Sequence, residues 1–179
     1  MLEEQKKSIR RTLIQKRNQL TENEILISES IISEQFWKEV DELPKVLHTY
    51  IPINNEASTM SIIKKALALN WTVVVPQTLK NRQMNHLILH SLEDLEKEKF
   101  GTFVPKRKEL FEGEIDHILV PGVAFSNSNG RMGYGGGYYD TFLPQYPSAK
   151  KWGITYKLQI IDDLPLEKHD IPMDALIIG

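Results

Sequence analysis

The chain contains no cysteine among its 179 residues. A disulfide framework, a metal site built from thiolates and a cysteine nucleophile are therefore all excluded. Serine chemistry has little support either, because the sequence offers no nucleophile-elbow motif that would expose a serine to a histidine and an aspartate. An enzyme made from this chain must work without a thiol and without an evident side-chain nucleophile.

Long apolar runs and a strong net charge are also missing. No segment approaches the 18 apolar residues of a membrane-spanning helix, and the charged start leads into no apolar stretch. A formal net charge of −2 gives no whole-molecule attraction for nucleic acid. We therefore expect a soluble, cytoplasmic protein that binds neither membranes nor nucleic acid, and we also expect a monomer.

Glycine, in contrast, is concentrated in one place. Residues 130–140 read GRMGYGGGYYD, so four of the ten glycines fall between Gly133 and Gly137. A run of this kind adds almost no side-chain volume, but it lets bare N–H groups approach a ligand closely. With Arg131 just upstream and a helix expected to open at Tyr138, the segment indicates a phosphate-binding loop.

Generic phosphate motifs do not fit this loop. A P-loop has Lys and then Ser or Thr after its last glycine, whereas this loop continues with Tyr138 and Tyr139, and a dinucleotide fingerprint has a glycine at the position of Tyr138. The segment instead closely resembles the signature of the 5-formyltetrahydrofolate cyclo-ligase family, also called 5,10-methenyltetrahydrofolate synthetase. It departs from that signature in Met132, which replaces Leu, and in the run-in at 129–131.

Strand-like and helical stretches alternate along the chain. Short strands are expected at 46–51, 71–75, 84–89, 115–120, 151–154 and 175–178, and helices at 59–69 and 140–146. This order predicts a single-domain, Rossmann-like, three-layer α/β fold whose mostly parallel sheet has helices on both faces. The glycine loop follows the fourth strand, where ligands bind in such sheets. The Lys/Glu-rich piece from Glu93 to Glu114 is interpreted as a solvated excursion.

The first 40 residues predict an N-terminal helical pair. Thr21 and Glu24 form a capping box that begins the second helix. On the first helix, an apolar stripe about 40° wide is predicted at roughly 100° per residue. The stripe consists of Leu2, Ile9, Leu13 and Leu20.

Basic residues of the first helix fall into two groups. Lys6, Arg10 and Arg17 project about 40° to 80° from the centre of the stripe, whereas Lys7 and Arg11 point more than about 130° away and should be solvated. By themselves, Lys6 and Arg10 are most simply explained as charges whose stems lie along the edge of the core.

The resemblance changes that interpretation, because the family opens with a Lys-x-x-x-Arg pair that Lys6 and Arg10 match. It implies that the first helix and the glycine loop bind ATP, and that Lys6, Arg10 and Arg131 are catalytic. The residues implied for ATP are Lys6, Lys7, Ser8, Ile9, Arg10, Arg131, Met132, Gly133, Tyr134, Gly135, Gly136, Gly137, Tyr138 and Tyr139. The whole chain, 1–179, would be one catalytic domain that binds ATP and folate.

Folate contacts are implied at the loop after the first strand. There the family provides an apolar or backbone contact and then a glutamate, which spacing assigns to Ile51 and Glu56; Tyr134 and Tyr138 are also implied at the substrate. One carboxylate can accept hydrogen bonds from a pterin ring N–H and the adjacent amino group. The alternative is that Glu56 is a first-turn charge of the following helix.

Two aspartates are implied as ligands of Mg²⁺, the expected cofactor. They are Asp140, which closes the glycine loop, and Asp170, which follows the Leu164-Pro165 turn. Mg²⁺ usually takes one or two protein carboxylates, with waters and phosphate oxygens completing its octahedron. The alternative is that Asp140 is an N-terminal charge of its helix.

The implied activity is the ATP-dependent conversion of 5-formyltetrahydrofolate to 5,10-methenyltetrahydrofolate. Two other classes stay open: a sugar-phosphate isomerase or acyl transferase of the same architecture, and a non-catalytic nucleotide sensor. The sensor remains open because the family usually has an aspartate where this chain has Ser126.

Overall fold

The computed structural model describes residues 2–98, 101–167 and 170–179. Its centre is a six-stranded sheet with the order β10-β9-β6-β1-β2-β3. These strands are β1 (Val46–His48), β2 (Thr72–Thr78), β3 (Met84–Leu89), β6 (His117–Val120), β9 (Lys150–Thr155) and β10 (Ala175–Ile178). All neighbouring strands are parallel except β2 and β3, which form an antiparallel hairpin. The predicted mostly parallel α/β fold is confirmed.

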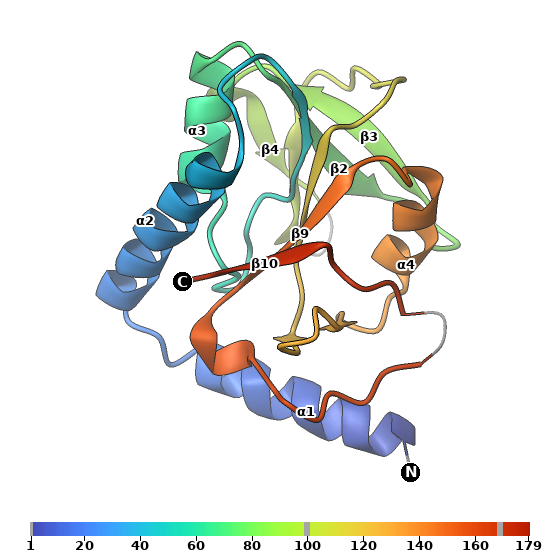
Figure 1. Cartoon of the computed structure of the whole chain (residues 1–179). Coiled ribbons are helices and arrows are strands. Elements are labelled where there is room, and N and C mark those ends of the chain that lie inside the picture. Colours follow the sequence, from blue (N-terminus) through green and yellow to red (C-terminus); the bar gives the residue numbers. More distant parts are fainter. Residues whose placement is uncertain (1, 99–100, 168–169) are drawn as a thin grey trace.

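Helices cover both faces of this sheet, as predicted (Figure 1). On one face α2 (Glu22–Glu39) and α3 (Met60–Ala68) bury Phe36 and Ile63 against the strands. On the other face α4 (Tyr138–Phe142) and the 3-10 helix η3 (Leu143–Gln145) bury Phe142 and Leu143. In the part of the chain that is described, no helix is both long and apolar enough to cross a membrane.

The first helix, α1 (Leu2–Arg17), lies apart from these layers (Figure 1). It packs on a small antiparallel hairpin formed by β7 (Ala124–Phe125) and β8 (Arg131–Met132). The contact explains the apolar stripe, since Leu13 is buried among Val123, Ala124 and Met132. Because β8 leads directly into the glycine loop, α1 is held beside that loop.

The interpretation of 93–114 as a solvated excursion is wrong for the described residues. This region contains η1 (Leu92–Asp94) and an antiparallel pair, β4 (Leu95–Lys97) and β5 (Phe103–Pro105). Val104 is 1% exposed and belongs to the main core. Further on, the N–H of Phe111 donates to the carbonyl of His86, so the segment covers the edge strand β3, which would otherwise present unpaired backbone groups.

Element boundaries differ from the predictions mainly near the ligand-binding edge. The first strand ends at His48 rather than at residue 51, and the freed segment forms a loop at the carboxyl end of β1. The helix expected at 140–146 begins at Tyr138 and passes into a 3-10 turn. The capping box is confirmed, because the Thr21 side chain accepts from the Glu24 N–H and the Glu24 carboxylate accepts from the Thr21 N–H. A last 3-10 turn, η4, covers Lys157–Gln159.

Candidate active site

A cavity of about 1680 Å³ lies at the carboxyl ends of β1, β2 and β6. Its walls come from α1, the loop after β1, the β2–β3 turn, the glycine loop and two residues near the C-terminus, Glu167 and Asp170. Pockets for one small ligand usually measure about 300 to 1,000 Å³. The cavity is therefore large enough for two ligands side by side.

Nearly all residues predicted for the site line this cavity. Of those implied for ATP, folate and metal, Ser8 and Ile9 are outside the described lining, and Ile9 packs instead against the cluster around Leu13. Lys7 is exposed and lines the cavity, although the helical wheel treats it as an ordinary solvated charge like Arg11. The structure thus brings the two ends of the chain and the glycine loop to one place.

The glycine loop needs glycine for specific reasons. Gly135 and Gly137 have φ values of +94° and +70°, the left-handed region that other residues enter at a cost. Gly137 is the N-cap of α4. At Gly133 a Cβ atom would lie 2.8 Å from Nη1 of Arg131, so the absence of a side chain there makes room for the guanidinium.

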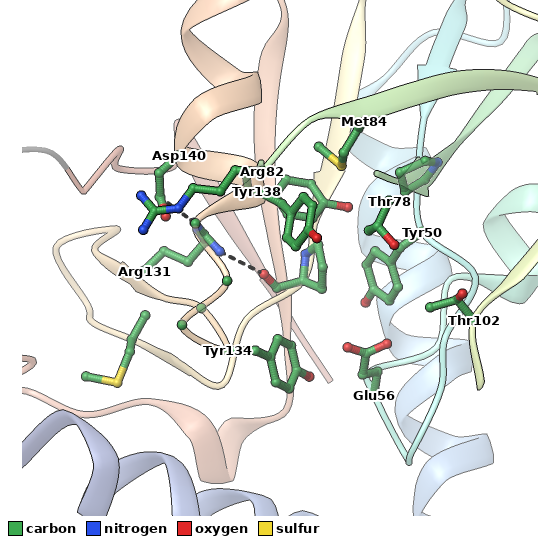
Figure 2. A pocket seen from close by; sticks show the side chains of 18 of the residues that line it. Tyr50, Glu56, Thr78, Arg82, Met84, Thr102, Arg131, Tyr134, Tyr138 and Asp140 are labelled. Carbon is green, nitrogen blue, oxygen red and sulfur yellow. Dashed lines mark hydrogen bonds and ion pairs between the residues drawn. The ribbon is translucent and has the colours of Figure 1, made fainter. Parts of the chain in front are cut away.

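Arg131 is buried beneath the loop, with 4% exposure. Its Nη2 donates to Oδ1 of Asp140 at 2.6 Å, and its Nη1 donates to the carbonyl of Pro121 at 3.3 Å (Figure 2). Asp140 is thus more than a first-turn helix charge, since it neutralises a buried cation. Arg131 in β8 thereby binds both the start of α4 and the residue that follows β6, and these bonds hold the loop in place.

Lys6 and Arg10 reach the cavity from α1. Lys6 is 4% exposed, and its Nζ lies 2.6 Å from Oε2 of Glu167 and 3.3 Å from Oδ2 of Asp170. Burial lowers the pKa of Lys6, but the two carboxylates outweigh it and the net shift is upward. Arg10 donates from Nε to the carbonyl of Gly133 at 2.9 Å. The simpler interpretation of Lys6 as a solvated charge at the core edge is wrong.

Glu56 lies at the other end of the cavity, facing Tyr50 and Tyr134 (Figure 2). It precedes α3 by several residues, and its Oε2 accepts from the N–H of Ile53 at 3.0 Å, so the first-turn alternative is wrong. Burial raises the pKa of Glu56, while hydrogen bonds from Tyr134 and the Ile53 N–H and the charge of Arg17 oppose that rise. A largely buried carboxylate of this kind is suited to accept hydrogen bonds from a ligand.

Arg17 and Arg82 also approach the site. The helical wheel places Arg17 on the same side of α1 as Lys6, but no motif assigns either arginine to the site. Arg82 is in the β2–β3 turn, and a Cβ at Gly137 would lie 3.2 Å from its side chain. Tyr138 ties this turn to the glycine loop by donating to the carbonyl of Leu79 at 2.9 Å. With the described residues Arg82 makes no hydrogen bond or ion pair. The short polar stretch between the strands at 72–78 and 84–89 is the one sequence signal for this turn.

The cavity offers two carboxylates as candidate ligands for Mg²⁺. Asp140 and Asp170 both line the cavity, and each carboxylate has one oxygen bonded to a cation. Among the described residues there is no group of three or more His, Cys, Asp or Glu side chains that could hold an ion. Mg²⁺ is commonly bound by one or two protein carboxylates, with phosphate oxygens and water as its other ligands, and Asp140 and Asp170 fit that pattern.

Ser126 belongs to the β7–β8 hairpin rather than to the cavity lining among the described residues. It is 2% exposed, and its Oγ accepts from the N–H of Gly130 at 3.0 Å. The hydroxyl therefore shapes the turn that leads to Arg131. Ser126 therefore acts on the hairpin and makes no direct contribution to the described lining of the cavity.

An open α/β sheet with a glycine loop, converging cations and a buried carboxylate at its strand ends defines an enzyme for small anionic ligands. The chain belongs to the 5-formyltetrahydrofolate cyclo-ligase family, whose model matches residues 2–179.

Individual relatives agree with this assignment. The 5-formyltetrahydrofolate cyclo-ligase of Saccharomyces cerevisiae is 32% identical over 148 residues, covering 69% of this chain and 70% of that protein. The structure of a 5,10-methenyltetrahydrofolate synthetase from Aquifex aeolicus is similar with a TM-score of 0.82 and 28% identity, covering 97% of this chain and 89% of the other. The synthetase from Mycoplasma pneumoniae gives a TM-score of 0.75 at 26% identity over 96% and 97% of the two chains.

Proposed function

We propose that this single domain uses ATP to convert 5-formyltetrahydrofolate to 5,10-methenyltetrahydrofolate, with release of ADP and phosphate. The observation that carries the proposal is the cavity, which combines a buried carboxylate at one end with a cation-rich glycine loop at the other. The first end suits a pterin with adjacent N–H donors, and the second suits a triphosphate. The names of the relatives agree with this substrate.

The folate would bind with its pterin against Glu56. The carboxylate accepts from the ring N–H and the amino group together, and Ile51 offers an apolar contact beside it. Tyr134 and Tyr138 line the path from this end to the glycine loop. This placement directs the N5-formyl group toward the loop.

The triphosphate would lie along the glycine loop. Arg10 and Lys6 approach from α1 and Arg82 from the β2–β3 turn, so cations face the loop from both sides. Arg131 is already bonded to Asp140 and Pro121, so its main contribution is to hold the loop and the aspartate. Asp140 and Asp170 would hold Mg²⁺. When bound, the ion would neutralise charge on the phosphate oxygens.

The reaction then needs no side-chain nucleophile. The formyl oxygen attacks the γ-phosphorus as the bond to ADP breaks, which turns a poor leaving group into an imidate phosphate. The N10 nitrogen adds to the activated carbon, the carbon–oxygen bond breaks, phosphate leaves, and N10 loses its proton. The protein contributes position and charge neutralisation, which suits a chain without cysteine.

One assay tests the proposal. Pure protein is incubated with 5-formyltetrahydrofolate and Mg-ATP, and the methenyl chromophore and ADP are measured in equal amounts over time. Stabilisation by ATP without any turnover of the folate would instead identify a nucleotide sensor. Neither stabilisation by nucleotide nor folate turnover would favour an isomerase or acyl transferase of the same architecture.

A further inference from the structure

Arg17, the last residue of α1, is buried and has an unusual set of neighbours. It is 2% exposed, its Nη1 donates to the Tyr134 hydroxyl at 2.5 Å, and its Cζ lies 5.5 Å from the centre of the Tyr134 ring. Its Nε is buried without a hydrogen-bond partner, and no carboxylate of the described residues forms an ion pair with it. A buried cation is costly unless another charge or dipole compensates it.

The compensating charge is Glu56. The charge of this carboxylate raises the pKa of four tyrosines: Tyr50 after β1, Tyr134 in the glycine loop, Tyr139 in α4 and Tyr156 after β9. The charge of Arg17 acts on Glu56 and lowers its pKa. Burial raises the pKa of Glu56, and Arg17, which donates to the Tyr134 hydroxyl, opposes that rise.

The hydrogen bonds have a direction that links the three groups. An arginine N–H can only donate, so the Tyr134 oxygen accepts from Arg17 and its own hydrogen is left for Glu56. A cation on the phenol oxygen strengthens the phenol as a donor. Figure 2 shows the Tyr134 ring directed toward Glu56 across the cavity.

We propose that Arg17 is a positioning residue for folate recognition, which acts through Tyr134 to keep Glu56 ionised in its buried corner. The inference rests on the proposed binding of the pterin by Glu56. An ionised carboxylate accepts two hydrogen bonds side by side, whereas a protonated one presents a hydroxyl to one of the two pterin donors. Loss of Arg17 therefore weakens folate binding most at low pH, where Glu56 is closest to protonation.

The test begins without any ligand. The Glu56 carboxyl carbon is followed by ¹³C NMR through a pH titration and is assigned with E56Q. In R17M, which keeps an unbranched apolar stem but removes the guanidinium and its charge, the midpoint moves to higher pH. R17K keeps the charge and restores most of the wild-type value. Y134F shifts the midpoint upward by less than R17M, and K16M, an exposed cation one position away, leaves it unchanged.

The second readout is the KM for 5-formyltetrahydrofolate at two pH values. R17M raises it on the order of tenfold at pH 6 but about twofold at pH 8, while the KM for ATP stays unchanged. An unchanged Glu56 midpoint in R17M, or a KM raised equally at both pH values, would overturn the inference and make Arg17 a packing residue. If R17M does not fold, Y134F provides the same comparison. If R17M shifts the Glu56 midpoint but the wild-type protein turns over no folate, the proposed reaction is refuted and the effect of Arg17 on Glu56 is not.

Discussion

Removal of Asp140 should destabilise the protein even without any ligand, because it leaves Arg131 as an unpaired cation. The side chains of the pair are 3% and 25% exposed, respectively for Arg131 and Asp140. Breaking a fully buried pair costs about 3 to 5 kcal/mol, and the partial exposure of Asp140 reduces this to about 2 to 3 kcal/mol for Asp140→Ala. Asp140→Asn keeps a hydrogen-bond acceptor and should cost about 1 to 2 kcal/mol.

Thermal unfolding measures this directly. For a domain of this size 1 kcal/mol corresponds to about 2 to 4 °C, so the Tm of Asp140→Ala should fall by roughly 5 to 10 °C. Arg131→Met removes the cation, and the double variant should be less destabilised than the two single variants together. Asp163→Ala, an exposed aspartate, is the control. A Tm within about 2 °C of wild type for Asp140→Ala would refute the reasoning.

Substitution of Asp140 also distinguishes a role in binding Mg²⁺ from its role as the ion-pair partner of Arg131. If Asp140 also reaches Mg²⁺, Asp140→Asn and Asp170→Asn should each raise the Mg²⁺ concentration needed for half activity. Since both would act on one ion, the double variant should lose less than the sum of the single effects. A lower Tm with an unchanged Mg²⁺ requirement would leave Asp140 as the partner of Arg131 alone.

Three further results are expected. Arg10→Ala should raise the KM for ATP tenfold or more, since a charge-assisted contact contributes about 1.5 to 3 kcal/mol, whereas Arg11→Ala should leave it unchanged. Glu56→Gln should raise the KM for folate about tenfold with little effect on ATP, and a change within twofold would contradict its role. Burial lowers the pKa of both His48 and His86, so they stay neutral in the folded protein. The stability that depends on these neutral histidines should therefore be fully present above about pH 6.5 and should decrease as the pH falls below that value. His48→Gln should make the Tm depend less on pH between about pH 7 and 5.

Local signals in the sequence predict much of the fold. The strands at 84–89 and 175–178 and the capping box at Thr21 match the structure, because apolar runs and cap chemistry act over a few neighbouring residues. The β4–β5 and β7–β8 hairpins were not predicted. Their strands are two or three residues long and are stabilised by distant segments, such as α1 against β7.

The site shows the same division. The glycine loop is found from its own composition, whereas Glu56 and the cations of α1 are assigned to the site only by the family resemblance. The structure gathers all of them in one cavity. Arg17 projects from α1 much as Lys6 does, yet its burial depends on Tyr134, which lies 117 positions away. No local pattern contains that information. The position of Arg82 likewise depends on distant residues. Its side chain lies against Gly137, and Tyr138 binds the β2–β3 turn through the carbonyl of Leu79.

The contact between Lys6 and Asp170 joins residues 164 positions apart. It links the first turns of α1 to the last part of the chain, so one wall of the cavity exists only once both ends have met. During synthesis, the glycine loop can leave the ribosome before the residues that complete its surroundings. A ligand that bridges this wall would stabilise the finished fold over every partly folded form, and its binding would therefore report that the chain has completed folding.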